Sequence, residues 1–234
     1  MLKLKEDILD YSQSDAFVLI EGETGSGKTL VAHALHAVSQ NMARAIITVH
    51  CSAYDEATLS RRLFGPIEEK DEFLPAFEEA KGGTLILEDI ETITTELQGK
   101  LLDKLVALEN SLETRLITIS NHSSPTFTKK ILRDDLYFRL SSLKISVPAL
   151  RKRGNDILDL FSQYSLSFSE EYGCSPPSLT SEQSRQLMQA PWQGNVRQLI
   201  NIAEQIVIQS RRGELNLSSL LMISEEHVDN SITS

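Results

Sequence analysis

The chain has 234 residues, enough for one large domain or for a medium domain with a small attachment. Hydrophobic residues make up 41% and the net charge is −10, which indicates an ordinary globular protein, too acidic to bind nucleic acid by neutralising phosphates alone. No apolar run reaches the length of a membrane span and no signal peptide precedes the first predicted strand, so we expect a cytoplasmic protein without a membrane partner.

Hydrophobic periodicity predicts five strands separated by helices. Residues 1–14 have the pattern of an amphipathic helix that leads into an apolar strand at 17–20. Four further strands are predicted at 46–51, 84–88, 116–120 and 143–147. Because helix-like sequence separates each strand from the next, we expect a parallel sheet with right-handed crossovers.

The character of the chain changes after Pro148. The segment 148–155 is rich in charge and turn residues and is the predicted joint. Helices without intervening strands are predicted beyond it, at 156–172, 181–189 and 195–210. Asn195 is expected to cap the last of them. The final third is therefore predicted to be a small helical bundle.

The segment from Ala16 to Thr29 joins a strand pattern, a glycine-rich turn and a helix pattern. The turn reads Gly22-Glu23-Thr24-Gly25-Ser26-Gly27-Lys28-Thr29. Such glycines let the backbone wrap an anion, and the helix that follows points free N–H groups and its positive dipole end at it. Lys28 would reach the β- and γ-phosphates, and the Thr29 hydroxyl would take a Mg²⁺ position. A tight turn that matches by chance is the alternative, but both flanks favour a site for a nucleoside triphosphate.

An acidic pair follows the third predicted strand. The run 82–89 ends in Glu88 and Asp89, at the carboxyl end of a strand, where ligands bind in open parallel sheets. A triphosphate hydrolase needs carboxylates there to hold the metal and to polarise the attacking water. Taken alone, the pair would indicate an acidic strand end facing solvent. Together with the upstream loop, it predicts the second half of a nucleotide site.

Cysteine and histidine positions add no metal site. Cys51 and Cys174 have neither metal nor redox spacing, which fits a reducing compartment, and Cys51 is predicted to be a small buried residue. His33 and His36 could share a metal through helical spacing. No third ligand is evident, so both are predicted to lie on the helix surface.

Six motifs together resemble one known family over most of the chain. They are Gly22–Thr29, Leu63–Gly65, Gly82–Asp89, Arg133–Leu140, Pro148–Arg153 and Pro191–Leu199. The Asp-Leu-Tyr-Phe-Arg-Leu and Pro-Trp-Gln-Gly-Asn-Val-Arg segments are the most specific of them. The chain resembles the AAA+ domain of bacterial enhancer-binding transcription activators, a group that includes two-component response regulators and works with sigma-54 RNA polymerase.

The resemblance implies a fold, ligands and partners. The fold would be α/β, with a P-loop AAA+ five-stranded parallel sheet between helices at 1–150. A small all-α lid would follow at 151–222, and a polar tail at 223–234. The ligands would be ATP and Mg²⁺, with Thr29 and Glu88 at the metal. The partners would be other copies of the chain in a hexameric or heptameric ring, RNA polymerase, and DNA only through a domain not present in this chain.

The resemblance also implies roles for four residues outside the phosphate loop. Asn121 is similar to the sensor that reads the γ-phosphate, and Arg197 to the second sensor on the lid. Arg133 and Arg139 are similar to arginine fingers, which reach into the neighbouring subunit and neutralise transition-state charge. From the residues alone, two arginines near acidic residues would indicate surface ion pairs.

Four departures from the family pattern modify this expectation. The sigma-54-contacting Gly-Ala-Phe-Thr-Gly-Ala motif is missing between Gly65 and Phe77, and the insertion before the sensor strand is contracted. The family's Asp-Glu order is reversed as Glu88-Asp89, which sets the second carboxylate about 1.5 Å further back. His50 stands where the family usually has Asn, at the residue thought to restrain the catalytic carboxylate.

These departures lead to a specific functional hypothesis and two alternatives. The chain is expected to be the ATP-binding module of a bacterial transcriptional regulator, with slow ATP hydrolysis at subunit interfaces and without action through sigma-54. The first alternative is a non-hydrolysing nucleotide sensor that controls oligomeric state. A weaker one is a P-loop kinase, against which the lid motif argues.

Overall fold

The computed structural model describes residues 1–65, 74–109, 114–122, 131–211, 217 and 219–221. The chain is divided into two compact units. The α/β unit joins Met1–Gly22 to Gly27–Val147, and the lid unit joins Glu23–Ser26 to Pro148–Ser234. The predicted fold, a five-stranded parallel sheet with helices and a following helical region, is confirmed. The boundaries at 1–150 and 151–222 stay a prediction, and the tail at 223–234 lies outside the described residues.

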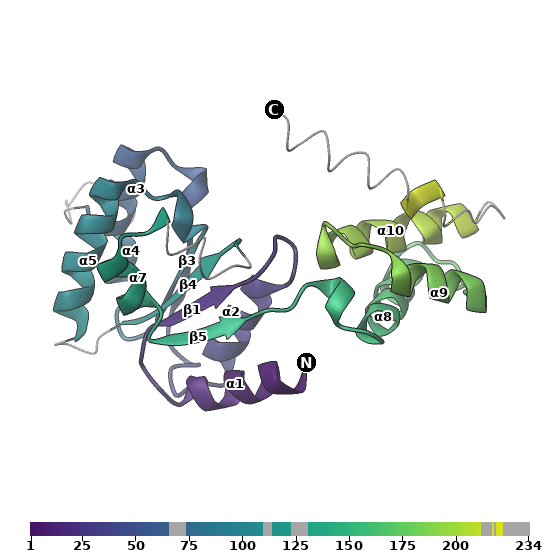
Figure 1. Cartoon of the computed structure of the whole chain (residues 1–234), viewed down its shortest axis with the longest axis horizontal. Coiled ribbons are helices and arrows are strands. Elements are labelled where there is room, and N and C mark those ends of the chain that lie inside the picture. The colour runs from purple at the N-terminus through teal and green to yellow at the C-terminus, as the bar shows by residue number, and fades with distance from the viewer. Residues whose placement is uncertain (66–73, 110–113, 123–130, 212–216, 218, 222–234) are drawn as a thin grey trace. The chain divides into compact units, whose positions relative to one another are not determined.

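The five strands are parallel and follow the order β2-β3-β4-β1-β5 (Figure 1). Their bounds are Val18–Glu21 for β1, Ile46–His50 for β2, Thr84–Glu88 for β3, Arg115–Ser120 for β4 and Leu143–Ser146 for β5. Every residue of β1, β3 and β4 is buried, because helices cover both faces of the sheet. This double burial explains why these strands read in the sequence as continuous apolar runs.

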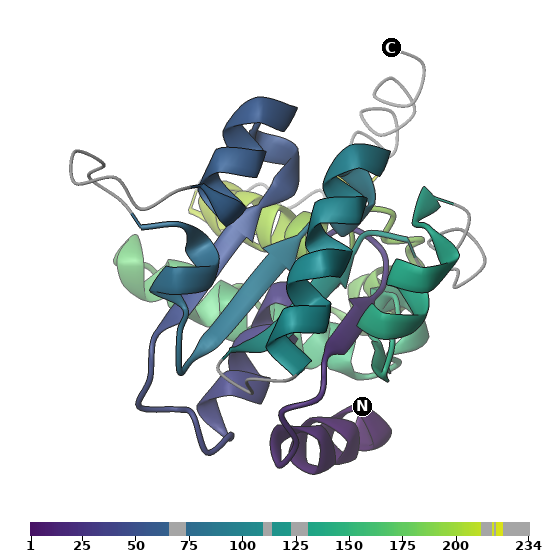
Figure 2. The same cartoon turned by 90° about the vertical axis from the view of Figure 1, so that its left-hand side faces the viewer.

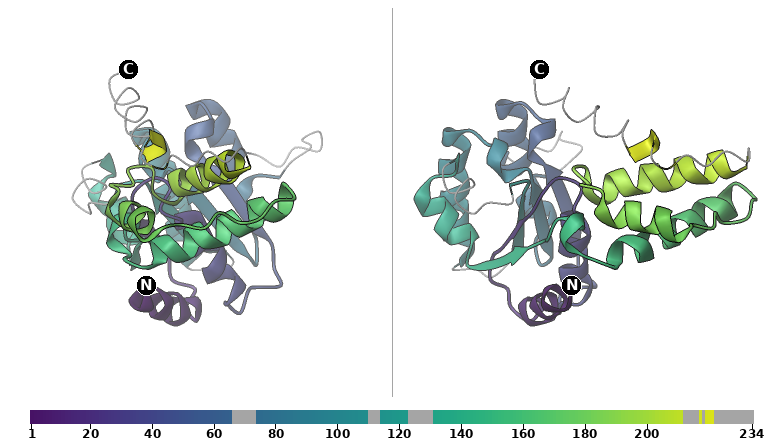
Figure 3. Two further views of the ribbon diagram at one scale, coloured as in Figure 1. Left: turned by 90° about the vertical axis from the view of Figure 1, so that its right-hand side faces the viewer. Right: turned by 45° about the vertical axis from the view of Figure 1, so that its right-hand side comes forward.

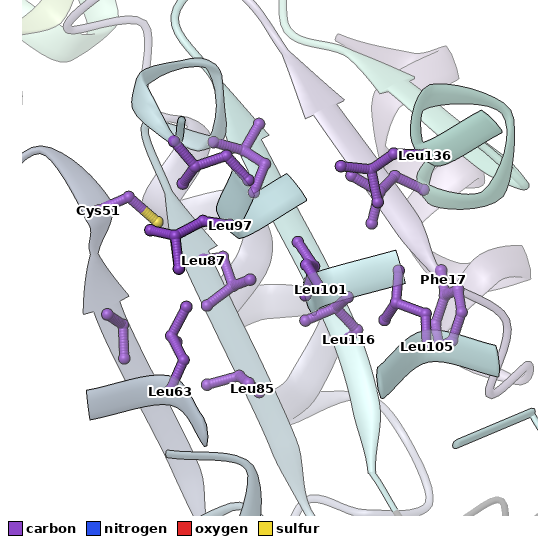
Figure 4. Packing of buried hydrophobic residues seen from close by; sticks show 14 of the residues in the cluster. Phe17, Cys51, Leu63, Leu85, Leu87, Leu97, Leu101, Leu105, Leu116 and Leu136 are labelled. Carbon is purple, nitrogen blue, oxygen red and sulfur yellow. The ribbon is translucent and has the colours of Figure 1, made fainter. Parts of the chain in front are cut away.

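One face of the sheet packs against four helices. Figure 2 views the molecule from the side of these helices. They are α3 (Glu56–Phe64), α4 (Ala76–Glu79), α5 (Thr95–Glu109) and α7 (Asp134–Leu140). Leucines of the strands, such as Leu85, Leu87 and Leu116, meet leucines of α5 and α7 in a buried layer (Figure 4). The opposite face, built from alternate strand residues, packs against α1 (Leu2–Ser12) and α2 (Lys28–Ala37).

A histidine on α2 is buried against the sheet. His36 is 6% exposed, and its Nδ1 lies 2.9 Å from Thr84 Oγ1. Burial, followed by the charge of Arg115, lowers the pKa of His36, so the neutral imidazole is favoured. The prediction that His36 lies on the helix surface was therefore wrong. His33 is exposed.

Arg115 at the start of β4 joins the carboxyl ends of two helices. It is 2% exposed, and its guanidinium donates to Tyr11 O at 2.7 Å and to Leu35 O at 3.5 Å. Both carbonyls lie in the last turn of their helices, where a cation is favourable. Burial lowers the pKa of Arg115. The side chain thus adds a charged donor to two carbonyls at helix ends, of which Tyr11 O also accepts from Ser14 N at 3.2 Å.

We expect Arg115→Met to destabilise the α/β unit by about 3 kcal/mol, because it removes a charged donor from two partly buried carbonyls. The thermal midpoint should fall by roughly 6–12 °C, measured by far-ultraviolet circular dichroism. Arg44→Met is the matched control, since Arg44 is exposed. Equal midpoints for the two variants would contradict a stabilising role for Arg115.

The lid unit has its own hydrophobic core among three helices (Figure 3). These are α8 (Asp156–Glu171), α9 (Ser181–Gln189) and α10 (Asn195–Ser210). Trp192 is fully buried at the centre, and its Nε1 donates to Leu187 O at 2.8 Å. Thr180 and Gln183 form a capping box at the start of α9. In the described part of the chain, no helix is long and apolar enough to cross a membrane.

Candidate functional site

The glycine-rich segment between β1 and α2 is divided between the two units. Gly22 and Gly27 belong to the α/β unit, whereas the residues between them belong to the lid unit. Lys28, 5% exposed, and Thr29, exposed, form the first turn of α2. Gly27 has φ 97°, a left-handed conformation that strains residues with a side chain. A glycine-rich turn thus leads directly into the N-terminus of a helix, an arrangement that can bind anions.

The acidic pair lies at the carboxyl edge of the sheet, beside the end of β4. Asp89 has φ 56°, which its short side chain tolerates better than a glutamate would. Asn121 Nδ2 donates to Asp89 Oδ1, and Ser52 Oγ donates to Asp89 Oδ2. The structure therefore brings Asp89 and Asn121 together, and both carboxylate oxygens of Asp89 accept hydrogen bonds.

Glu88 has a different environment from its neighbour. His50 Nδ1 lies 3.5 Å from Glu88 Oε2, so this histidine lies beside Glu88. Glu88 Oε1 is buried without a hydrogen-bond partner among the described residues. The backbone N–H of Asn121 donates to Glu91 Oε1 at 2.9 Å, which places a third carboxylate at this edge.

Cys51 lies directly behind the carboxylates. It is 2% exposed, as predicted. Burial, followed by the negative charges of Asp89, Glu91 and Glu88, raises the pKa of the thiol to about 12. The thiol therefore stays protonated at neutral pH and is not a nucleophile.

Within the lid unit, polar side chains hold the tip of the phosphate loop. Arg151 donates two hydrogen bonds to the Glu23 carboxylate, at 2.6 and 2.5 Å, and this pairing lowers the pKa of Glu23. Asn195 Nδ2 donates to Thr24 O at 3.0 Å and to Glu23 Oε2 at 3.2 Å, while its Oδ1 accepts from Leu150 N at 2.8 Å. Asn195 makes no capping bond, so the predicted cap on α10 was wrong.

We expect Asn195→Asp to destabilise the lid unit by about 2 kcal/mol, because it removes two donated hydrogen bonds and adds a carboxylate beside Glu23. Trp192 is the one tryptophan of the chain, so its fluorescence during urea unfolding reports on this unit. Asn201→Asp is the control on the exposed face of the same helix. A urea midpoint no lower than that of the control would refute the stabilising role.

The second-sensor candidate also lies against the loop. Val196 N donates to Gly25 O at 2.9 Å. A Cβ added to Gly25 would lie 2.5 Å from Gly194 O and 3.2 Å from Arg197 Cβ, and Gly25 has φ 73°. Glycine is therefore required at position 25 for both conformation and close approach. The Cβ of Arg197 therefore lies next to the loop at Gly25, and the side chain of Arg197 is exposed.

The two candidate arginine fingers lie at the two ends of α7. Arg133 precedes this helix and pairs with Asp135 at 2.7 Å, with side chains 44% and 48% exposed. This is the surface ion pair that the residues alone indicated, and such a pair contributes little stability. Arg139 lies in the last turn and is half-buried. Whether either arginine acts in a neighbouring subunit stays a prediction.

The family of the chain follows from its similarity to known proteins. A family model described as the sigma-54 interaction domain matches residues 1–146, and one described as the AAA+ ATPase lid domain matches residues 151–231. The chain belongs to the sigma-54 interaction domain family. The resemblance inferred from the motifs is thereby confirmed, and this AAA+ domain is of the type found in bacterial transcriptional regulators.

Curated relatives and a solved structure agree with this assignment. The domain is 34% identical over 230 residues to the nitrogen fixation protein AnfA of Azotobacter vinelandii, covering 90% of this chain and 42% of AnfA. It is 35% identical over 225 residues to the regulatory protein ZraR of Salmonella typhimurium, covering 89% and 51%. NtrX of Brucella abortus in complex with ATP superposes with a TM-score of 0.83 at 28% identity, covering 94% and 54%. The domain thus spans about half of these relatives or less.

Several polar residues near the glycine-rich loop and the carboxylates were not predicted from the sequence. Ser52 and Glu91 lie shortly after strand ends at the carboxyl edge, a position that could have marked them. Arg151 lies in the segment that was read only as a charged joint. Asn195 was assigned to its own helix instead of to the loop.

Proposed function

We propose that this domain binds Mg·ATP through residues 22–29, with Lys28 at the β- and γ-phosphates and Arg197 at the nucleotide from the lid. The observation that carries the proposal is the phosphate loop at the end of β1, with Glu88, Asp89 and Asn121 at the ends of β3 and β4 in the same sheet. The NtrX structure, which contains ATP, supports it.

The oxygen donors at the edge fit a magnesium ion. Thr29 offers an exposed hydroxyl, and Glu88 offers a buried carboxylate oxygen without a hydrogen-bond partner in the described part of the chain. Among the described residues, no three His, Cys, Asp or Glu side chains are grouped as a metal site. One hydroxyl and one carboxylate are enough protein ligands for Mg²⁺, because this ion usually keeps several water ligands and is also bound by phosphate oxygens of the substrate. When bound, it would neutralise charge on the phosphates.

We further propose slow hydrolysis at subunit interfaces in a hexameric or heptameric ring. In this reaction Asp89 would polarise the attacking water, Asn121 would orient it toward the γ-phosphate, and Arg139, with Arg133, would serve the neighbour's ATP. The hydrogen bonds from Ser52 and Asn121 to Asp89 support a slow rate, because they fix the orientation of a side chain that is already one methylene shorter than glutamate.

We expect a domain carrying both Glu88→Asp and Asp89→Glu to hydrolyse ATP faster by about tenfold to a hundredfold, because the second carboxylate regains reach. Steady-state phosphate release at saturating Mg·ATP measures this. Glu6→Asp with Asp7→Glu is the matched control, a pair in the same Glu-Asp order on α1. An unchanged rate would show that carboxylate reach does not limit turnover.

The biological role we propose is that of an ATP-binding module in a bacterial transcriptional regulator that does not act through sigma-54. The sequence supports it: no Gly-Ala-Phe-Thr-Gly-Ala motif occurs between Gly65 and Phe77. Much of this interval, residues 66–73, and the contracted segment at 110–113 lie outside the described residues. Open-complex formation by sigma-54 polymerase, driven by the full-length regulator, would refute this part of the proposal.

A second candidate is a nucleotide sensor that does not hydrolyse ATP and controls oligomeric state. The observation that favours it is the same pair of hydrogen bonds, which occupies both oxygens of Asp89. Phosphate release and light scattering, measured on one sample with and without Mg·ATP, separate the two candidates. Assembly without phosphate release supports the sensor, whereas release that increases with assembly supports the ATPase.

A further inference from the structure

An ion pair between a buried carboxylate and a partly exposed lysine lies at the start of the phosphate loop. Glu21 is the last residue of β1, and its side chain is 1% exposed. Lys144 Nζ on β5 lies 2.7 Å from Glu21 Oε2. Apart from this ion pair, the carboxylate oxygens have no hydrogen-bond partner among the described residues. Since a buried charge is unfavourable unless it is paired, the position of Lys144 is strongly constrained by Glu21.

Lys144 also contacts Tyr137 on α7. Its Nζ donates to Tyr137 Oη at 2.9 Å and lies 5.4 Å from the centre of the tyrosine ring. Burial acts to lower the pKa of Lys144, but the attraction of Glu21 and the bond to Tyr137 outweigh it, so the pKa is raised and the ammonium stays charged. The three side chains form one network, which we call the Glu21–Lys144–Tyr137 network.

The register of the sheet explains why these residues meet. Lys144 pairs with Leu19, and Glu21 follows Leu19 by two residues, so all three project from the same face. This is the face against which α7 packs, where Figure 4 shows Leu136 over the strands. Tyr137 follows Leu136, and Arg139 lies two residues further along the same short helix.

We propose that the Glu21–Lys144–Tyr137 network sets the orientation of α7 from the strand that begins the phosphate loop, and so positions Arg139 for the ATP of a neighbouring subunit. The inference rests on the proposed shared site. Gly22, the next residue after Glu21, starts the loop, so the network links a subunit's own nucleotide site to the arginine that it offers. The three side chains are positioning residues, because none of them touches the proposed ligand.

Tyr137→Phe tests the proposal with little change in packing, because it removes the hydroxyl and keeps the ring. We expect the affinity for ATP and the KM to stay near the wild-type values, while kcat falls by about tenfold or more, as for a displaced catalytic group. Tyr11→Phe, on the opposite face of the sheet, is the matched control. A merely structural role would instead lower the melting midpoint and leave the kcat of the folded protein unchanged.

Mixing subunits locates the defect. A Lys28→Ala subunit cannot use its own site but carries an intact α7, so it should serve the site of a Tyr137→Phe subunit. An equal mixture should therefore turn over ATP several-fold faster than the two variants measured separately. A mixture of Lys28→Ala with Arg139→Ala is the reference, because it tests the shared site without involving the network.

The outcomes separate the inference from the proposed function. Failure of the reference mixture to recover activity refutes the shared site, and the inference with it. Recovery in the reference but not with Tyr137→Phe, or a kcat of Tyr137→Phe equal to wild type, refutes the inference alone. Should Tyr137→Phe fold poorly, Glu21→Gln combined with Lys144→Met removes both charges of the pair together, and the same pattern of recovery is expected.

Discussion

Lys28→Ala is expected to abolish the stabilisation of the domain by Mg·ATP. A ligand that binds only the native state stabilises it by RT ln(1 + [L]/Kd), about 2.7 kcal/mol at a hundredfold excess over Kd. Lys28 begins α2 directly after the loop, so its ammonium is the cation we assign to the phosphates. The shift of the thermal midpoint with Mg·ATP measures the effect, and the midpoint of the variant without nucleotide should stay close to that of the wild type.

The matched control for this experiment is Lys3→Ala, which removes an exposed lysine from α1. This variant should keep the full shift with Mg·ATP. If the wild-type domain melts normally and ATP fails to raise its midpoint, the assignment of residues 22–29 to the nucleotide is wrong. If Lys28→Ala keeps the shift, the phosphates are held by other groups.

Arg139→Ala is expected to suppress ATP turnover by about a thousandfold, the usual effect of removing an arginine finger, while ATP binding by the variant stays nearly unchanged. The physical reason is that the finger acts on the neighbour's ATP. Wild-type turnover per subunit should therefore increase with protein concentration. When Arg139→Ala is mixed into wild type, activity should fall by more than its mole fraction, because each variant subunit disables its partner's site.

Arg139 is the test residue because it lies in the last turn of α7, whereas Arg133 precedes this helix. Arg185→Ala on α9, where the arginine pairs with Glu182 at the surface, is the control and should not change turnover. A linear mixing curve, together with turnover independent of protein concentration, would rule out a shared site.

The fold could be predicted from patterns within short, contiguous segments of the sequence. The glycine-rich turn, the acidic pair and the apolar strand runs are contiguous segments, so each can be recognised without knowing what it contacts. The order of strands and helices then implied a parallel sheet with crossovers, which the structure confirms. Most strand ends were right to within one residue, because burial on both faces marks where an apolar run stops.

The placement of polar side chains was decided only by the tertiary structure. Arg115 meets Tyr11 across 104 residues of sequence, and Asn195 meets Glu23 across 172. Asn195 stands at the start of a helix pattern, so the sequence suggests a helix cap. Only the folded chain shows that its side-chain amide instead donates a hydrogen bond to Thr24 O in the loop. Buried polar groups require partners, but the sequence does not say which partner will be near.

The acidic pair Glu88-Asp89 also shows which features can be predicted from the sequence and which depend on the tertiary structure. The sequence alone determined that Glu88 and Asp89 stand at the end of a buried strand, and it predicted that they complete a nucleotide site with residues 22–29. The left-handed backbone of Asp89, its bonds to Ser52 and Asn121, and the approach of His50 to Glu88 arise where three strand ends converge. Such convergence depends on strand order and register, which are set by packing of the whole sheet and by no single segment.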